Sequence, residues 1–163
     1  MLNSRFLDIH KEGNELTCDL RRCFEVHFGL SMRRREARRR VRLHLKSVGQ
    51  LAASSADDCF RVALNSDLLP AMAVIDRIDR DLAAIAKRPL TSHEVQDALH
   101  ITARERIRWT KDKRLPTSGT FTARRRQIVT INTYLVNDLR ELYLQPATIE
   151  DWRAADKVVA EPA

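Results

Sequence analysis

The sequence predicts a mainly α-helical protein with one short β-hairpin. Glycine and proline are scarce, with four and five occurrences in 163 residues, and both disrupt helix interiors. Two residue pairs with the spacing of helix-capping boxes lie close together in the second half, and β-branched and aromatic residues follow them. We expect a helical region over 1–88, a second domain over 89–145, and a short C-terminal helix and tail over 146–163.

The capping boxes predict two short helices. Thr91 precedes Glu94 by three residues, and Thr102 precedes Glu105 by three. In such a pair the hydroxyl accepts from a free backbone amide, and the carboxylate accepts from another. The helices should begin near Ser92 and Ala103. Only residues 99–102 separate them, which is the length of a helix-turn-helix connection.

The second of these helices carries most of its basic residues on one side. Arg104, Arg108 and Lys111 follow the spacing i, i+4, i+7 and share an outward face, with Arg106 beside them. The helix should end near Leu115, because a proline disfavours helical geometry in the residue before it. A small core is predicted from four apolar residues: Val95, Leu99, Ile101 and Ile107.

A β-hairpin should follow this helix. Residues 120–123 and 127–133 are rich in β-branched and aromatic types, and the turn between them would hold Arg124, Arg125 and Arg126. Asn137 then offers an N-cap for a further helix. The resulting order of helix, turn, helix, hairpin and helix is that of a winged helix-turn-helix.

This segment resembles the MerR-like and excisionase-like winged helix-turn-helix proteins. The likeness is carried by residues 91–95, 99–102, 107–109 and 113–116, although Lys113 stands where the family usually has glycine. The resemblance implies DNA contact through the second helix and the wing. Carried over by position, it points to Thr102, Arg104, Glu105, Arg106, Arg108, Arg124, Arg125 and Arg126, and the outward face adds Lys111.

The N-terminal region is expected to contain three longer helices. Amphipathic spacing predicts helices over 14–28 and 69–87, and a serine cap followed by acidic residues predicts another over 56–65. In the helix over 69–87, apolar residues recur at intervals of three and four: Ile75, Ile78, Leu82 and Ile85. This stripe has two interpretations, which are packing within the monomer and the seam of a homodimer.

An arginine-rich run lies in the same region. Residues 33–42 contain seven arginines and one acidic residue. The run has three interpretations: a helix lying along DNA phosphates, a docking surface for an acidic protein, and a solvated helical face. Residues 41–46 also alternate as a short strand would. The candidate phosphate contacts are Arg34, Arg35, Arg38 and Arg39.

Charge and hydropathy narrow the class of partner. The net charge is +7, and a basic surface suits nucleic acid or an anionic membrane. Residues 90–134 carry nine Lys and Arg against four Asp and Glu, whereas residues 135–163 carry three against six. No apolar run is long enough to cross a membrane and no secretory signal is apparent, so we expect a cytoplasmic, nucleoid-associated protein.

Enzyme and metal motifs are not evident. The sequence has no phosphate-binding loop, no glycine-rich dinucleotide motif and no nucleophile elbow, so we expect no catalytic residues and no cofactor. Cys18, Cys23 and His27 suggest zinc, but there is no Cys-x-x-Cys pair, and positions 18 and 23 diverge on a helix. We therefore expect no metal site.

Together these observations predict a sequence-specific protein that binds double-stranded DNA, either a transcriptional regulator or an accessory factor of a mobile element. A homodimer would suit paired half-sites. The alternative is an adaptor or inhibitor that docks its arginine-rich surface on an acidic or RNA-containing partner. Direct RNA recognition is less favoured, because only 6% of residues are aromatic and single-stranded RNA is bound by stacking.

Overall fold

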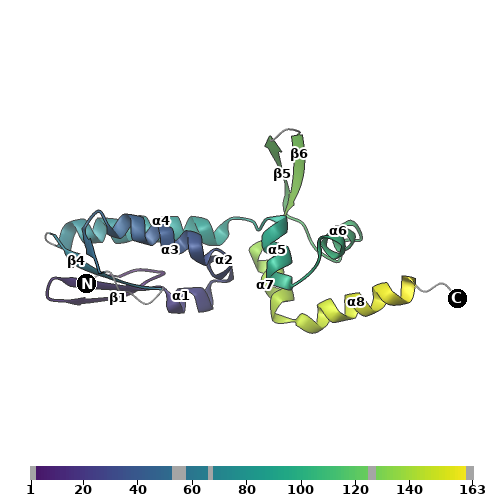
Figure 1. Ribbon diagram of the computed structural model, residues 1–163, viewed down its shortest axis with the longest axis horizontal. Helices are drawn as coiled ribbons and strands as arrows, with labels where there is room; N and C mark the ends of the chain where they lie inside the picture. Colours follow the sequence, from purple (N-terminus) through teal and green to yellow (C-terminus); the bar gives the residue numbers. More distant parts are fainter. Residues whose placement is uncertain (1–2, 53–57, 66–67, 125–127, 161–163) are drawn as a thin grey trace. The chain divides into compact units, whose positions relative to one another are not determined.

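The computed structural model describes residues 3–52, 58–65, 68–124 and 128–160 (Figure 1). They form eight helices and six strands, divided between two compact units. Unit 1 runs from Met1 to Lys87 and unit 2 from Arg88 to Ala163. Within the described ranges, no helix is long and apolar enough to cross a membrane.

Unit 1 is built on a four-stranded antiparallel sheet rather than on helices alone. Its strands, in sheet order, are β1 (Asp8–Glu12), β2 (Glu15–Asp19), β4 (Cys59–Leu64) and β3 (Gly49–Leu51). The prediction of a mainly α fold with an N-terminal helical region is therefore wrong, and the protein is mixed α and β. Helices cover one face of the sheet (Figure 1).

The helix predicted over 14–28 is strand in its first half, β2, and helix only from Arg21 onward, and the helix predicted over 56–65 is replaced by strand β4. Leu16, Cys18 and Leu20 alternate along the chain and are all fully buried. In β4, Phe60 and Val62 alternate in the same way, and they pair with Cys18 and Leu16 across the ladder. A period of two is that of a strand with one buried face. The buried side chains of β2 and β4 thus form one wall of the unit 1 core.

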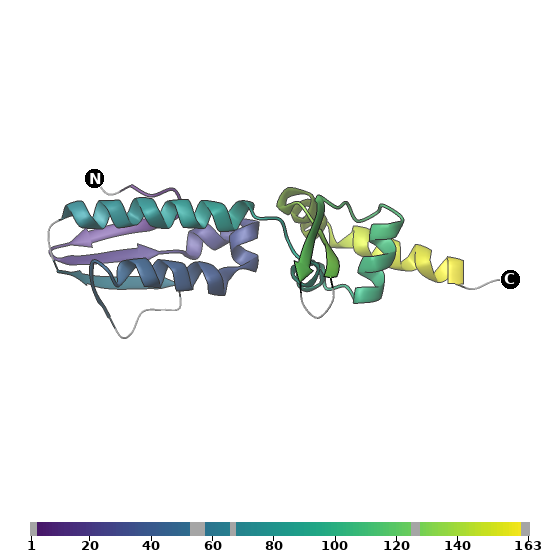
Figure 2. The same ribbon diagram turned by 90° about the horizontal axis from the view of Figure 1, so that it is seen from above.

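The described residues of unit 1 also form four helices: α1 (Arg21–Val26), α2 (Phe28–Met32), α3 (Arg34–Leu45) and α4 (Leu68–Lys87). Helices α3 and α4 run side by side over the sheet (Figures 1 and 2). Ala37, Val41 and Leu45 of α3 are fully buried. Because α3 remains helical through Leu45, the alternative prediction of a strand over 41–46 is wrong.

Helix α4 begins within one residue of its predicted start and ends where predicted. Its apolar stripe is at most 5% exposed and belongs to the core of unit 1. The stripe therefore packs within the monomer, and it is not available as a dimer seam.

Unit 2 contains the elements expected from the capping boxes and the hairpin. They are α5 (Ser92–Leu99), α6 (Ala103–Lys111), β5 (Gly119–Arg124), β6 (Ile128–Thr133), α7 (Val136–Leu144) and α8 (Pro146–Ala160). Strands β5 and β6 form a separate two-stranded sheet that projects from the helices of this unit (Figure 1). Helix α8 has 15 residues and is longer than the short terminal helix we expected.

Two described residues of unit 2 other than glycine have left-handed backbone geometry. His100 closes α5 with φ of 51°, and Lys113 has φ of 65° just after α6. His100 and Lys113 occupy positions where glycine is more usual, because glycine adopts positive φ without a Cβ clash. The turn at Lys113 ends α6 at Lys111 rather than near Leu115 as predicted, and Leu115 is buried beyond the helix.

Candidate nucleic-acid interface

Helix α6 starts at a complete capping box. The Glu105 amide donates to Thr102 Oγ1 at 3.2 Å, and the Thr102 amide donates to Glu105 Oε2 at 2.7 Å. The same reciprocal pair, Thr91 and Glu94, starts α5. Both predicted boxes are confirmed. In this structure the Thr102 and Glu105 side chains each accept from the backbone amide of the other residue, so their first role is to fix the start of α6.

The inner face of α6 is occupied by Trp109 and Arg106. Trp109 is fully buried. Arg106 is half-buried, and its guanidinium donates from Nε to Gln96 Oε1 and from Nη1 to the Tyr134 hydroxyl, both at 3.1 Å. Arg106 was expected beside the outward basic face, but these bonds direct it toward α5 and the end of β6. No local pattern identifies such partners, which are ten and 28 residues away.

Helix α8 holds α6 through the half-buried carboxylate of Asp156. Asp156 Oδ2 accepts from Trp109 Nε1 at 2.9 Å and lies 2.8 Å from Arg108 Nη1, while Oδ1 accepts from Arg114 Nη2 at 2.7 Å. The hydrogen bond from Arg114, followed by that from Trp109, holds the pKa of Asp156 below its ordinary value. Arg108, expected to point outward, therefore pairs within the unit, although its side chain is 55% exposed.

A second contact from α8 reaches the start of α6. Arg153 Nε donates to Glu105 Oε1 at 2.8 Å, and Arg153 Nη2 donates to the His100 carbonyl at 2.9 Å. Burial raises the pKa of Glu105, but hydrogen bonds from Arg153 and Thr102 outweigh it, and the net pKa is lowered. Both ends of α6 are thus fixed by α8, so α6 is presented as a rigid element.

The outward face of α6 remains exposed. It comprises Arg104, Ile107, Arg108 and Lys111, which we call the α6 outer face. No described residue forms a hydrogen bond or ion pair with Arg104 or Lys111. Ile107 was predicted in the core, but it is 58% exposed, because Trp109 and Ile101 fill the space beneath the helix. The face therefore combines cationic side chains with one aliphatic side chain.

The wing pairs in a regular antiparallel register from Gly119–Thr133 to Arg124–Ile128. Arg124 is the last residue of β5 rather than part of the turn. Arg125 and Arg126, also predicted at the tip, lie outside the described residues. On the described part of β5, Thr120, Phe121 and Thr122 are exposed.

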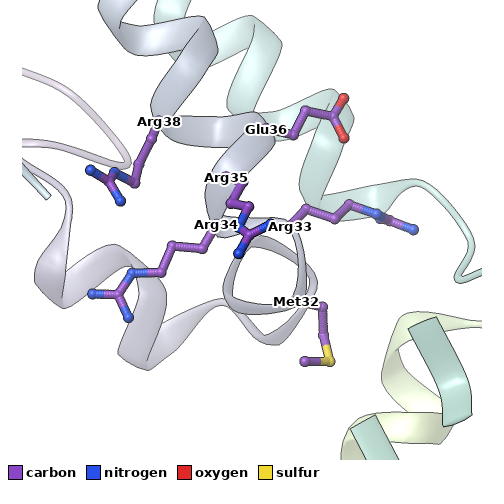
Figure 3. Close-up of a pocket in the computed structure, with 6 residues that line it drawn as sticks. All are labelled: Met32, Arg33, Arg34, Arg35, Glu36 and Arg38. Carbon is purple, nitrogen blue, oxygen red and sulfur yellow. The ribbon is translucent and has the colours of Figure 1, made fainter. Parts of the chain in front are cut away.

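The arginine run of unit 1 divides into two sets. Arg34 pairs with the buried carboxylate of Asp58 and stacks over Phe24, and Arg38 Nε lies 3.7 Å from Asp58. In Figure 3, Arg34 and Arg38 point to the same side of α3, away from Glu36. These two predicted phosphate contacts therefore serve first to anchor α3 within unit 1, and no local pattern identifies the distant Asp58 as their partner.

The other set forms an exposed stripe. Arg35 and Arg39 are exposed, and two residues not among our candidates continue their row at helical spacing: Arg42 and Lys46. We call these four the α3 stripe. They border two shallow hollows, and one of these has a volume of about 220 Å³ and includes Phe60 beneath Arg42. The i, i+4, i+7, i+11 spacing could have revealed the full stripe once α3 was assigned as a helix.

The cysteines belong to the core rather than to a ligand cluster. Cys18 lies on β2 and Cys23 on α1, both buried. Burial raises the pKa of each thiol to about 12, which disfavours the thiolate that binds zinc. Among the described residues, no group of three or more His, Cys, Asp or Glu side chains is placed to hold a metal ion.

Comparisons of the chain with protein-family models, with curated proteins and with solved structures found no match.

Acid should weaken the attachment of α8 to α6. The pKa of Asp156 is lowered from 3.8 in the folded unit. Its stabilising contribution is therefore complete above the unfolded value and is lost as the pH falls through the folded value. We expect indole fluorescence to report loosening of the Trp109–Trp152 pair below about pH 4. Asp156→Asn should show a smaller pH response there, and an identical response in both proteins would contradict this assignment.

Proposed function

We propose that the protein binds double-stranded DNA in a sequence-specific manner through unit 2, as a transcriptional regulator or an accessory factor of a mobile element. The observation that carries the proposal is the α6 outer face, a rigidly held cationic surface on the second helix of a helix-turn-helix. A helix of this kind fits the major groove. The resemblance to MerR-like and excisionase-like proteins supports the same assignment.

Each candidate residue then has a distinct role. Arg104 and Lys111 reach base edges or phosphates from the outer face, and Arg108 joins them while remaining paired with Asp156. Arg124, Arg125 and Arg126 contact the backbone or the minor groove from the wing. Thr102, Glu105 and Arg106 position α6, and the amides of Ala103 and Arg104, which the capping box does not use, are the ones a phosphate would bond. The protein would accordingly be nucleoid-associated.

The α3 stripe extends the proposal to unit 1. Arg35, Arg39, Arg42 and Lys46 present four cations along about three helical turns. Such a row suits the phosphate backbone, and contacts of this type add affinity without sequence information. Arg34 and Arg38 supply positive charge behind the stripe while they hold Asp58.

The experiment that tests the proposal is selection of bound duplexes from a random DNA pool at about 150 mM salt, which suppresses purely electrostatic binding. Enrichment of one motif is the expected result, and a palindromic motif would indicate that a homodimer binds. Binding without enrichment would contradict sequence-specific recognition, and no binding would contradict the proposal as a whole.

A second candidate function is an adaptor that docks the α3 stripe on an acidic protein or RNA-containing partner. The observation that favours it is Leu43, which is 60% exposed and borders one hollow together with Arg39, Arg40, Arg42 and Lys46. A mixed apolar and basic surface is typical of protein interfaces. An adaptor would bind duplex DNA weakly and without preference.

Neutralising part of the α3 stripe should change the salt dependence of DNA binding. Each phosphate contact contributes about 0.9 to the slope of log affinity against log salt concentration. The double change Arg35→Ala and Arg39→Ala is therefore expected to reduce the slope by about 2, while the preferred motif stays the same. Both side chains are exposed, so folding should be retained. An unchanged slope would exclude these arginines from DNA contact.

A further inference from the structure

Ile107 is an aliphatic side chain at the centre of the α6 outer face. It is 58% exposed, although three other apolar residues of the α5–α6 region, Ile101, Trp109 and Leu115, are at most 5% exposed. A single exposed aliphatic residue is ordinary on a protein surface. The position of Ile107 among the candidate DNA-contacting residues is what carries the inference.

The helix places Ile107 between cations. Arg104 lies three residues before it and Lys111 four residues after it, so both are neighbours on the same face. Arg108 is adjacent in sequence and is fixed by its ion pair with Asp156. Any duplex held by these cations would bring its groove floor to the side chain of Ile107.

An isoleucine can read only one feature of the groove floor. It has no hydrogen-bonding group, so the donors and acceptors of the bases would be left unpaired beneath it. The methyl group at C5 of a pyrimidine is the apolar feature that the major groove presents, and apolar side chains contact it in DNA complexes. Thymine carries this methyl group, and 5-methylcytosine carries the same one.

Resting on the proposed function, we propose that Ile107 is a specificity-determining residue that contacts the C5 methyl group of a pyrimidine in the major groove. Arg104 and Lys111 then supply affinity and hydrogen-bonded readout on either side. Ile107 adds a preference for a methylated pyrimidine at the base pair beneath the middle of α6.

The test removes the methyl group alone. Starting from the duplex enriched by selection, each thymine is replaced in turn by uracil, which has the same pairing edge but lacks the methyl. We expect the unaltered protein to bind about three- to tenfold more weakly at one thymine per half-site, the loss that corresponds to one buried methyl group. A parallel series replaces each cytosine by 5-methylcytosine. If the methyl group that Ile107 contacts belongs to 5-methylcytosine rather than to thymine, affinity should increase at one of these cytosines.

Protein variants connect that effect to Ile107. In Ile107→Ala, the difference in affinity between the thymine duplex and the uracil duplex should disappear. Changing the protein and the base both separately and together forms a double-mutant cycle, which isolates the contact between Ile107 and the methyl group. Alanine has the higher helix propensity at this exposed position, so the variant should fold. Val158→Ala is the matched control, because Val158 is a β-branched residue that is 75% exposed on α8. It should keep the full difference.

The outcomes separate the two proposals. A protein that binds its preferred duplex but responds to no methyl substitution overturns the role of Ile107 and leaves the proposed function in place. A response that is equal in the unaltered protein and in Ile107→Ala also overturns it. Failure to bind any duplex overturns both.

Discussion

Replacing Trp109 with alanine is expected to destabilise unit 2 by about 3–5 kcal/mol, the usual cost of emptying a large aromatic site. Trp109 is fully buried, its ring meets that of Trp152 at 5.0 Å and 73°, and Arg114 lies over it at 5.7 Å. The change also removes the donor to Asp156. Such a loss is comparable with the whole stability of a small domain.

The measurement for Trp109→Ala should be local, because two compact units need not unfold in one transition. Native-state hydrogen exchange is suited to this, since it reports opening of each element separately. Amides of α5, α6 and α8 should lose protection, while those of β2 and β4 in unit 1 should keep theirs. Leu144→Ala is the control, because Leu144 is 60% exposed on α7, and it should cost no more than about 0.5 kcal/mol.

Trp109→Phe separates the two contributions. Phenylalanine retains much of the buried volume but cannot donate to Asp156, so its effect should be smaller than that of alanine and concentrated in α8. Equal hydrogen-exchange protection of α6 in the unaltered protein, Trp109→Ala and Trp109→Phe would contradict the central packing role of Trp109.

Unit 2 was more predictable from sequence than unit 1 because its signals are local. A capping box is complete within four residues, so Thr91 with Glu94 and Thr102 with Glu105 identified both helix starts. The hairpin strands were likewise recognisable from composition. The features of unit 2 that could not be predicted are its tertiary contacts. The partners of Arg106, Arg108 and Arg153 come from elements far along the chain, and they decide which arginines face outward.

The strands of unit 1 were not predicted, because two patterns overlap in its sequence. Leu16 and Leu20 have the i, i+4 spacing of a helix, but Cys18 between them is equally buried, so the true period is two. Near β4, acidic residues follow two serines, a pattern that is typical of a helix start. Asp58 instead lies buried against Arg34 and Arg38 of α3. A buried ion pair of this kind depends on the assembled fold, so no local pattern reveals it.

The pairing of Asp58 also changes the meaning of the arginine run. Arg33 is 4% exposed and donates to the Ile85 carbonyl at 2.9 Å, so it links α3 to α4. With Arg34 and Arg38 turned toward Asp58, the run is partly structural. Arg35, Arg39 and Arg42 of the run are exposed and belong to the α3 stripe, whose full extent required the helix to be known.

Replacing Arg104 with alanine is expected to weaken binding to the preferred duplex by about 10- to 100-fold and to relax the preference at one base pair. Arg104 is exposed on the first turn of α6, where a cation is unfavourable next to the positive end of the helix dipole. Its removal should therefore not destabilise the helix, so a loss of affinity reports DNA contact rather than unfolding. Binding to random duplex should fall only slightly.

Two further variants distinguish base recognition from simple charge. Arg104→Lys keeps the charge and the salt slope but lacks the planar fork that bonds guanine at two positions, so it should lose selectivity almost as fully as alanine does. Arg140→Ala removes an exposed arginine from α7 and should leave both affinity and motif unchanged. If Arg104→Ala weakened preferred and random duplexes equally, Arg104 would be a phosphate contact, and base recognition would have to come from the other residues of the α6 outer face or from the wing.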